Sequence, residues 1–388
     1  MDTESGAPRA HAEGRPAPPP RLLLLDVLRG IAILGTLATN IWLFLPGVAE
    51  SAGAFRAVLD PLLNGKSYAL LAMMFGIGLA VQHRSAAAHG RPWPGRHGWR
   101  QLLLLVEGAL HTVLLFAWDV LMGYAITALL VVWLLRRSGK ARTVVMWTAL
   151  GTNLVLMSAF TLLFTLFPAG DPDPATVGAQ ELLFIEGAYP EQVAQRWAGF
   201  FGTRAEILVA LPMCLFLFLL GVRLYRSGAF DDTAQGRLVR GRLLVWGLGL
   251  GLPLCVLGSV VPELGTAHRY ALSSLLMLGY VGLTGWLLDR VRGNGQVVRS
   301  LRAVGRTALT CYVLQNLLGS VVFYGWGLGL AGILVGAGPT VVAATVAAAY
   351  CTIVLILVTA ARMWSRRFAR GPLESVSARV LALLPERR

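Results

Sequence analysis

The chain has 388 residues, of which 56% are hydrophobic and 14% charged, and its mean hydropathy is +0.64. This composition leaves too little polar surface to cover a soluble globule of this size, so most of the apolar surface must face lipid. The net charge of +14 would suit a nucleic-acid binder, but the Lys and Arg residues fall in short segments between long apolar runs, which favours membrane lipids as partners and no nucleic acid.

The elements predicted along the chain are helices, because the apolar runs are about 20 residues long, which is the length that spans a bilayer. Residues 1–20 are rich in Pro and charge and are predicted to be a disordered cytoplasmic tail. Residues 21–370 are predicted to form an all-α transmembrane bundle of about ten spans, and 371–388 a cytoplasmic C-terminal segment. The expected spans are 22–45, 61–82, 101–117, 119–135, 143–167, 204–222, 243–261, 270–288, 307–323 and 340–361.

The distribution of Lys and Arg predicts the orientation of these spans. With ten spans, 28 of the basic residues fall on one side and 5 on the other, and Arg29 lies within the first span. Positively charged loops stay in the cytoplasm, so both chain ends are expected there. The sequence therefore predicts a multi-pass protein of the bacterial plasma (inner) membrane.

Ionisable residues inside spans are costly unless they are paired or hydrated, which makes them candidates for function. In the first span, Asp26, Arg29, Thr36 and Asn40 fall within one narrow arc of the helix. Asp26 and Arg29, three residues apart, could simply neutralise each other and fix a helix contact. A structural role and a ligand-binding role for this stripe remain equally open.

The third span carries the strongest chemical signal in the chain. Glu107 and His111 are four residues apart on one face, with Trp118 further along and Asp119 at the outer end. A lone His on an apolar helix is more often a packing residue than a catalyst. A carboxylate one turn away can orient the imidazole and stabilise its cation, as a general base requires, so both readings stay open.

Residues 168–203 form the longest segment expected outside, and it is acidic, with a single Arg196 against five carboxylates. The simpler expectation is a solvated loop. Because apolar residues recur between Glu181 and Phe201, a partly helical lid over an outward-facing cavity is the alternative.

The ninth span places Tyr312, Gln315, Asn316 and Gly319 on one face, with Arg306 at its cytoplasmic entrance. Amides buried in a membrane either bridge helices or bind a ligand, and bridging is the commoner case. No HxxxH, HExxH or carboxylate ladder is present, so no metal site is predicted. The four cysteines all lie in apolar runs and suggest no disulfide framework.

Several segments together carry a family resemblance over nearly the whole chain after the tail. LDVLRGIAILGTLATNI from Leu25, MMFGIGLAV from Met73, EGALHTVLLFAWDVLMGYA from Glu107, GRTALTCYVLQNLLG from Gly305 and the late RRFARGPLE resemble the YeiB-like family of uncharacterised bacterial membrane proteins, domain of unknown function 418. The LDxLRG opening is also similar to that of membrane acyltransferases of the heparan glucosaminide acetyltransferase type. That resemblance implies transfer of an acyl group from cytoplasmic acyl-CoA to a sugar outside. Those enzymes generally place a catalytic His in the outer part of the first or second span, where this chain offers Asn40 and no His, so the candidate base becomes His111.

The leading hypothesis is transfer of an acyl group, acetyl before others, to an envelope sugar or a small hydroxylated molecule, with acyl-CoA as donor substrate and no resident cofactor. His111 would be the general base, Glu107 or Asp119 would orient it, and Arg29 or Arg306 would bind donor phosphates. The remaining residues proposed to bind substrate are Asp26, Asn40, Tyr312, Gln315 and Asn316. One rival is a proton-coupled transporter or exporter, with Asp26, Arg29, Glu107 and His111 as a proton relay, and another is a non-catalytic scaffold.

Overall fold

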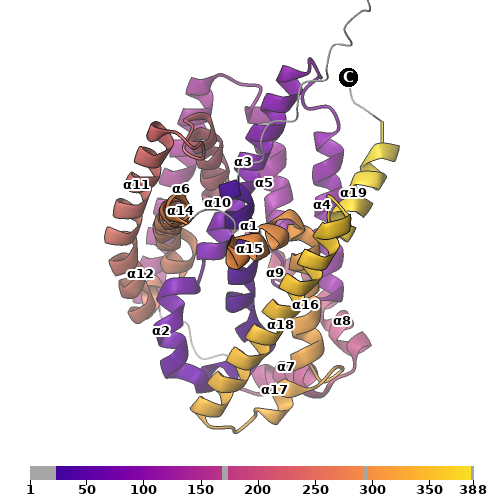
Figure 1. Ribbon diagram of the computed structural model, residues 1–388. Coiled ribbons are helices and arrows are strands. Elements are labelled where there is room, and N and C mark those ends of the chain that lie inside the picture. The colour runs from indigo at the N-terminus through magenta and orange to yellow at the C-terminus, as the bar shows by residue number, and fades with distance from the viewer. Residues whose placement is uncertain (1–22, 168–173, 292–294, 386–388) are drawn as a thin grey trace, which may run out of the picture.

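The computed structural model describes residues 23–167, 174–291 and 295–385, so the predicted tail at 1–20 lies outside the described residues. Every regular element in these three ranges is a helix, and no strand occurs in them. Figure 1 shows the longer helices running side by side as one bundle. The prediction of an all-α polytopic helical bundle is therefore confirmed.

The longer helices form the body of the bundle, and the shorter ones connect them. The longer ones are α1 (Leu23–Asn40), α3 (Lys66–Ala88), α4 (His97–Leu114), α5 (Leu121–Leu134), α6 (Gly139–Leu166), α10 (Glu206–Arg226), α11 (Ala234–Gly249), α14 (Ser273–Arg290), α16 (Ala308–Phe323) and α18 (Pro339–Arg367). The shorter ones are α2 (Gly53–Leu63), α7 (Pro174–Glu186), α8 (Tyr189–Ala198), α9 (Phe200–Arg204), α12 (Gly251–Val260), α13 (Gly265–Ala267), α15 (Gln296–Arg306), α17 (Leu330–Ile333), α19 (Pro372–Leu383), the 3-10 turns η1 (Ile41–Phe44), η2 (Ala49–Ala52) and η3 (Pro262–Leu264), and the π-helical turn η4 (His268–Leu272).

Helix α1 lies at the centre of the bundle, where it packs against α3, α14, α15, α16 and α18 (Figure 1). It is surrounded because its side chains are apolar or small on nearly every face, and Leu28, Ala32 and Leu37 are fully buried. The outer helices differ: α6 and α18 keep most of their apolar side chains exposed, as expected for surfaces that face lipid. Polar residues of α1 therefore meet other helices rather than lipid.

Close helix contacts depend on glycine at the motif that opens the first span. A Cβ on Gly30 would collide with the backbone of Leu301 in α15, and one on Gly305 would collide with the backbone carbonyl of Asp26. Small residues let membrane helices approach at backbone distance, where van der Waals contact holds them together. The Gly of LDxLRG is thus required for the α1 to α15 contact.

Seven helical stretches among the described residues are long and apolar enough to cross a membrane. They are Leu23–Phe44, Ala49–Ala88, Gly139–Leu166, Phe200–Arg226, Ala234–Val260, Pro262–Arg290 and Pro339–Arg367. Helices α5 and α16 are apolar but shorter, and α4 is in neither group. Each of the ten expected spans has a helix at its position, while the number that cross the bilayer stays a prediction.

The connection between the expected third and fourth spans is wider than the sequence indicated. Helix α4 ends at Leu114 and α5 begins at Leu121, so residues 115–120 form an irregular link rather than a tight turn around Trp118. A similar break precedes α3, where Gly65 adopts a left-handed backbone conformation with φ of +79°. Both irregular segments lie at the same end of the bundle.

The segment expected as a solvated loop is largely helical in its described part, which begins at Pro174. Helices α7 and α8 cover the end of the bundle, with Gln192 fully buried and Phe184 and Ile185 packed against an aromatic cluster that includes Phe44 and Tyr324. The partly helical alternative is the better description. These helices cover that cluster, and none of their residues lines the main pocket described below.

The two ends of the bundle differ in charge. One end, here called the basic end, carries the connections 84–100, 136–142 and 223–242 together with α15 and α19. The opposite end carries α2, α7, α8, α9 and α17 (Figure 1). The separation of charge seen in the sequence is thus preserved in the fold.

Candidate functional site

A continuous chain of polar side chains crosses the interior of the bundle, and we call it the polar chain. The Tyr68 hydroxyl donates to Asn40 Oδ1, and Asn40 Nδ2 donates to Asn316 Oδ1 over 3.3 Å. Asn316 Nδ2 lies 3.2 Å from His111 Nε2, and His111 Nδ1 lies 3.1 Å from Asp119 Oδ1. Helices α1, α3, α4 and α16 and the link before α5 each contribute one member. Segments far apart in the sequence thus meet in one site.

The direction of these contacts fixes the protonation pattern of His111. Because Asn316 Oδ1 already accepts from Asn40, the amide nitrogen is the group facing His111 Nε2, which must then be an unprotonated acceptor. A neutral imidazole consequently carries its hydrogen on Nδ1, the atom beside Asp119. This nitrogen lies 3.1 Å from Asp119 Oδ1, but the contact does not have hydrogen-bond geometry.

Asp119 is a fully buried carboxylate whose oxygens are well supplied with donors. Its Oδ2 accepts from the backbone N–H of Leu121 over 2.9 Å and of Met122 over 3.4 Å, at the first turn of α5. Its Oδ1 accepts from the Tyr312 hydroxyl over 3.1 Å in addition to facing His111. A helix N-terminus and neutral donors stabilise the anionic form, which is the form that can support an imidazolium.

Two arginines from the segment before α10 hold the link that carries Asp119. Arg196 Nε donates to Val113 O over 2.8 Å at the end of α4, where backbone carbonyls have no partner within the helix. Arg204 Nη1 donates to Asp119 O over 2.9 Å and also contacts Thr112. These contacts explain why basic residues occur at the end of the bundle where few others do.

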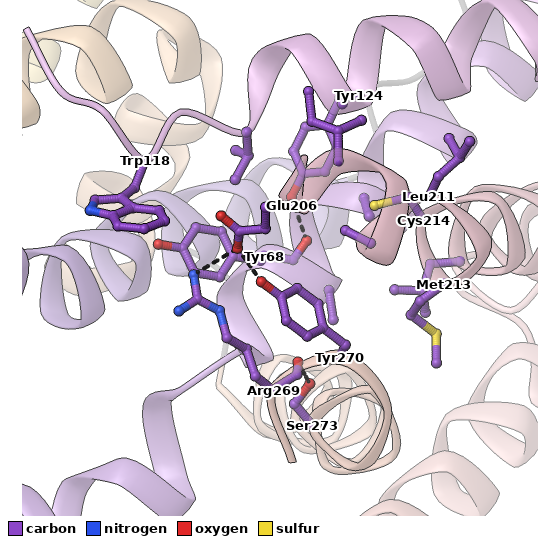
Figure 2. Close-up of a pocket in the computed structure, with 18 of the residues that line it drawn as sticks. Tyr68, Trp118, Tyr124, Glu206, Leu211, Met213, Cys214, Arg269, Tyr270 and Ser273 are labelled. Carbon is purple, nitrogen blue, oxygen red and sulfur yellow. Dashed lines mark hydrogen bonds and ion pairs between the residues drawn. The ribbon is translucent and has the colours of Figure 1, made fainter. Parts of the chain in front are cut away.

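The main pocket is a cavity of about 90 Å³ enclosed by α3, α5, α10 and the η4 to α14 segment. Asp119 and Tyr68, the two ends of the polar chain, both line it, whereas His111 lies one contact behind Asp119 and is 4% exposed. Figure 2 shows Trp118, Glu206 and Arg269 gathered on one side of it. The polar chain and the pocket therefore share two residues and form one candidate site.

The polar side of the main pocket is organised around Glu206. Arg269 Nη2 lies 3.3 Å from Glu206 Oε1, and the Tyr270 hydroxyl donates to the same oxygen (Figure 2). Trp118 closes this side and is 40% exposed. A wider open hollow of about 560 Å³ continues outward from these residues. The pocket consequently opens at the end of the bundle opposite the basic end.

The predicted partner Glu107 is not placed against His111. Its side chain accepts a hydrogen bond from Ser377 of α19 near the basic end, although it lies one turn from His111 on the same helix. Asp119 takes the position beside the imidazole instead, because the link after α4 folds back on that helix. Of the two carboxylates considered, the structure brings only Asp119 to the site.

The other predicted residues of the ninth span belong to the same interior. Gln315 Nε2 donates to Thr36 Oγ1 of α1 over 3.0 Å, and both are fully buried. Tyr312 and Asn316 reach Asp119 and His111, respectively. Helix bridging and contact with the candidate site are therefore combined on one helix face.

Asp26 and the predicted arginines lie at the basic end, away from His111. Arg29 Nη1 is 3.4 Å from Asp26 Oδ1, so the expected ion pair is present, and Arg302 Nε approaches Asp26 Oδ2 at 3.9 Å. Arg306 donates to Ala369 O over 3.3 Å. These residues form a basic surface at that end of the bundle.

A second buried cluster lies near the main pocket, in the turn before α3. Lys66 Nζ is 2.8 Å from His268 Nε2, and His268 Nδ1 is 3.6 Å from Asp60 Oδ2. Within the described ranges, no group of three or more His, Cys, Asp or Glu is positioned to hold a metal ion.

Sequence reasoning missed Tyr68, Arg204, Glu206 and Arg269. Tyr68 lies in a span and carries no charge, and the other three were counted among loop residues or span ends. Their common signal is a polar group within a few residues of the outer end of a span, where a pocket mouth is expected.

Comparison with known proteins finds one matching family model and two similar bacterial proteins. The family model for a protein of unknown function, DUF418, matches residues 224–383, which include α16 and α19. The chain is 26% identical to the uncharacterized protein YxaH of Bacillus subtilis over 391 residues, covering 91% of this chain and 92% of that protein. It is 27% identical to the uncharacterized protein YeiB of Escherichia coli over 339 residues, covering 79% and 85%.

Proposed function

We propose, from the premise that the chain is a YeiB-like protein of the DUF418 family, that it is a membrane acyltransferase of the bacterial inner membrane. It would transfer an acyl group, acetyl being the first to test, from a cytoplasmic acyl-CoA to a hydroxyl of an acceptor on the outer side. The integral membrane character of the chain is the firm part of this statement, because it follows from the seven long apolar helices of the described residues.

One observation carries the proposal, namely the buried pair of His111 and Asp119, in which the unprotonated Nε2 of His111 can accept a proton. The carboxylate lies on the Nδ1 side of the ring, as in hydrolases and transferases that use a His general base. Both side chains are at most 2% exposed, so water is kept from the reacting groups. Proton transfer by a positioned His contributes roughly 10² to 10⁴ in rate.

In the proposed reaction, the acceptor hydroxyl takes the place of Asn316 at His111 Nε2. The imidazole removes the hydroxyl proton as the oxygen bonds to the acyl carbon of the thioester, and the carbon–sulfur bond then breaks. The departing thiolate takes the proton from the imidazolium, which Asp119 stabilises while it is charged. The products are an O-acyl ester and free CoA, and His111 returns to its starting form.

The donor is proposed to bind at the basic end. Arg29 and Arg370 each lie close enough to Arg100 to repel its guanidinium, which favours a polyanion such as the phosphates of CoA. Along α4, Arg100 and His111 are about 16 Å apart at 1.5 Å per residue, a distance that the extended pantetheine arm can cover. Arg29 and Arg306 keep their proposed role as phosphate ligands in this arrangement.

The acceptor is proposed to enter from the opposite end, through the main pocket. The excess of Lys and Arg at the basic end supports placing that end, and both chain termini, in the cytoplasm. The predicted substrate-binding residues between the donor end and the acceptor end would then help to bind the two substrates. They are Asp26, Asn40, Gln315 and Asn316. An enzyme of this form joins a cytoplasmic donor to an envelope acceptor without moving either across the membrane.

A proton-coupled transporter is the second candidate, and the buried cluster of Lys66, His268 and Asp60 favours it, since acyl transfer does not use those residues. The polar chain argues against a relay along its own path. Its two amides, Asn40 and Asn316, do not readily take up and release protons near neutral pH. A scaffold without activity has no use for an aligned His and carboxylate.

The direct test uses the purified full chain in proteoliposomes with radiolabelled acetyl-CoA on one side and a bacterial envelope extract on the other. Wild-type protein should form a labelled, base-labile ester, and His111→Gln should not. His89→Gln serves as the matched control, because His89 is an exposed histidine at the end of α3.

Two results would contradict the proposal. One is an absence of labelled ester from wild-type protein with extracts and with defined sugar acceptors. The other is unchanged ester formation by a well-folded His111→Gln protein. Proton-coupled uptake of a solute without any acyl donor would instead favour the transporter.

A further inference from the structure

The main pocket changes character along its depth. Along α10 its lining extends from Glu206 to Leu217, which corresponds to about 16 Å at the helical rise. Along α3 it extends from Gly65 to Ala72. The pocket is therefore long relative to its volume of about 90 Å³, so it is narrow on average.

The outer part of the pocket is polar and wide. Glu206, Arg269 and Tyr270 form one hydrogen-bonded group there, and Trp118 presents its ring beside them (Figure 2). The adjoining hollow of about 560 Å³ shares these four residues and adds Asn64. An aromatic face beside paired charged groups suits a hydroxylated ring, which offers both apolar C–H faces and hydrogen-bonding edges.

The inner part of the pocket is apolar and is made by small residues. Leu211, Met213 and Cys214 lie at the far side of the pocket from Trp118 (Figure 2). The space exists because Ala72 of α3 and Ala210 of α10 carry only a methyl group. Such a narrow apolar channel suits an unbranched alkyl chain, since it excludes water and gains by burying methylene groups.

The mouth of the pocket is close to the surface that faces lipid. Near the polar groups that line it, Phe201 is 85% exposed and Leu208 is 72% exposed, and Trp118 is 40% exposed. Exposed Trp and Phe side chains of this kind gather at the membrane interface. A molecule held in the outer leaflet by a single chain could enter sideways without leaving the membrane.

We infer that the main pocket binds a single-chain amphiphile, with a hydroxylated head between Trp118 and the Glu206 and Arg269 pair and its alkyl chain in the inner channel. This inference deepens the proposed function. Only the identification of the amphiphile as the acyl acceptor rests on that function. A head in this position lies beside Asp119 and Tyr68, the two members of the polar chain that reach the pocket. For transfer, one of its hydroxyls moves past Tyr68 and Asn40 into the place of Asn316 at His111 Nε2.

The test measures equilibrium binding to the full chain in nanodiscs, without any acyl donor, and subtracts binding to empty nanodiscs. The radiolabelled probes are hexyl β-D-glucoside, methyl β-D-glucoside and hexan-1-ol. Hexyl glucoside should bind at least about tenfold more tightly than either other probe. Tenfold is about 1.4 kcal/mol and matches the burial of two methylene groups.

Two variants test where the alkyl chain and the head group of the amphiphile bind. A Cβ at Gly123 would meet only Ile207, at 3.8 Å. Because Ile207 follows Glu206 on α10, Gly123→Leu narrows the passage from the head site to the inner channel and should abolish the preference for hexyl over methyl glucoside. Gly151→Leu is the matched control, because Gly151 has open space around it on the exposed side of α6. Glu206→Gln should weaken both glucosides by about the same factor and leave hexan-1-ol unchanged.

Each half of the inference can fail separately. Equal binding of hexyl and methyl glucoside by wild-type protein would overturn the alkyl channel, and equal binding of hexyl glucoside and hexan-1-ol would overturn the head site. A Gly123→Leu protein that keeps the preference would overturn the location. The binding assay contains no acyl donor and is independent of the transfer assay. Amphiphile binding by a protein that shows no acyl transfer would refute the proposed function alone. Acyl transfer to acceptors regardless of their alkyl-chain length would refute this inference alone.

Discussion

Asp119 is the residue on which the candidate site depends, because it joins the polar chain, the start of α5 and the main pocket. Burying a carboxylate is costly unless donors replace the lost water. Two backbone N–H groups and the Tyr312 hydroxyl supply that replacement, and His111 Nδ1 lies 3.1 Å from Oδ1. The arrangement places a carboxylate beside an imidazole, which is the pairing that a His base requires.

The ion pair in the first span gives a prediction at the same scale. Asp26 lies between Arg29 and Arg302, so Asp26→Ala leaves two cations facing each other and should cost about 1 to 2 kcal/mol of stability. Arg29→Ala should cost less, since Arg302 still neutralises Asp26. The double variant should be milder than Asp26→Ala alone. Thermal unfolding in detergent measures these differences, and a double variant as unstable as the sum of the singles would show that the two residues do not interact.

The sequence was informative about individual residues wherever a charge had to lie inside a span. His111, Asp26 and Arg29 stand out on that criterion, and Asn316 and Tyr312 on the polar face of a helix. The choice between Glu107 and Asp119 could not be made, because spacing within one helix favours Glu107 while the link after α4 decides the contact. Tyr68 was missed because an uncharged Tyr in a span carries no cost that signals a role.

At the scale of the helices, glycine determines how closely the central elements approach. Gly30 and Gly305 meet at the contact between α1 and α15, and a similar pair, Gly76 and Gly221, joins α3 to α10. The polar chain spans helices that these contacts hold together. Distances of about 3 Å between its members are kept because the helices cannot separate without losing that packing.

Gly30→Ala should therefore destabilise the protein, by about 1 to 3 kcal/mol, because the new methyl group collides with the backbone of α15 rather than with a movable side chain. Gly151→Ala provides the comparison. That position is exposed in the middle of α6, so Ala should be neutral or slightly stabilising through its helix propensity. Equal melting temperatures for the two variants would contradict the proposed role of Gly30.

Helix positions were predictable, while their interruptions were not. Apolar runs of about 20 residues located all ten expected helices, because lipid exposure demands a continuous apolar stretch. The irregular link at 115–120 was not predicted, since two of its carbonyls are satisfied by Arg204 and the last carbonyls of α4 by Arg196, both from a distant segment. The helices α7 and α8 were weighed as an alternative to a loop and are present because Phe184 and Ile185 pack on the aromatic cluster.

At the scale of the whole molecule, the two ends of the bundle differ in both charge and access. The basic end carries clustered arginines, and the main pocket opens at the other end. Positive charge at one end and a hydroxyl-binding pocket at the other suit a donor and an acceptor that approach from opposite sides. The polar chain lies between them.

Reporter fusions test the orientation that this arrangement requires. Fusions after Lys140 and after Arg370 should report cytoplasm, and one near Asp173 should report the outside, because the excess of Lys and Arg stays in the cytoplasm. Asp173 lies outside the described residues, and the fusion tests its side of the membrane only. A cytoplasmic signal near Asp173 would contradict the ten-span arrangement.

The most direct test of the central claim is a double-mutant cycle on His111 and Asp119, measured as the rate of acyl transfer from labelled acetyl-CoA in proteoliposomes, with thermal unfolding measured alongside. His111→Gln and Asp119→Asn should each lower the rate by about 10² or more, and the double variant should be little worse than His111→Gln alone, because the two groups act as a unit. All three proteins should insert and remain folded. Fully additive losses, or undiminished transfer by a well-folded His111→Gln protein, would remove the pair from the chemistry and leave the transporter as the better description.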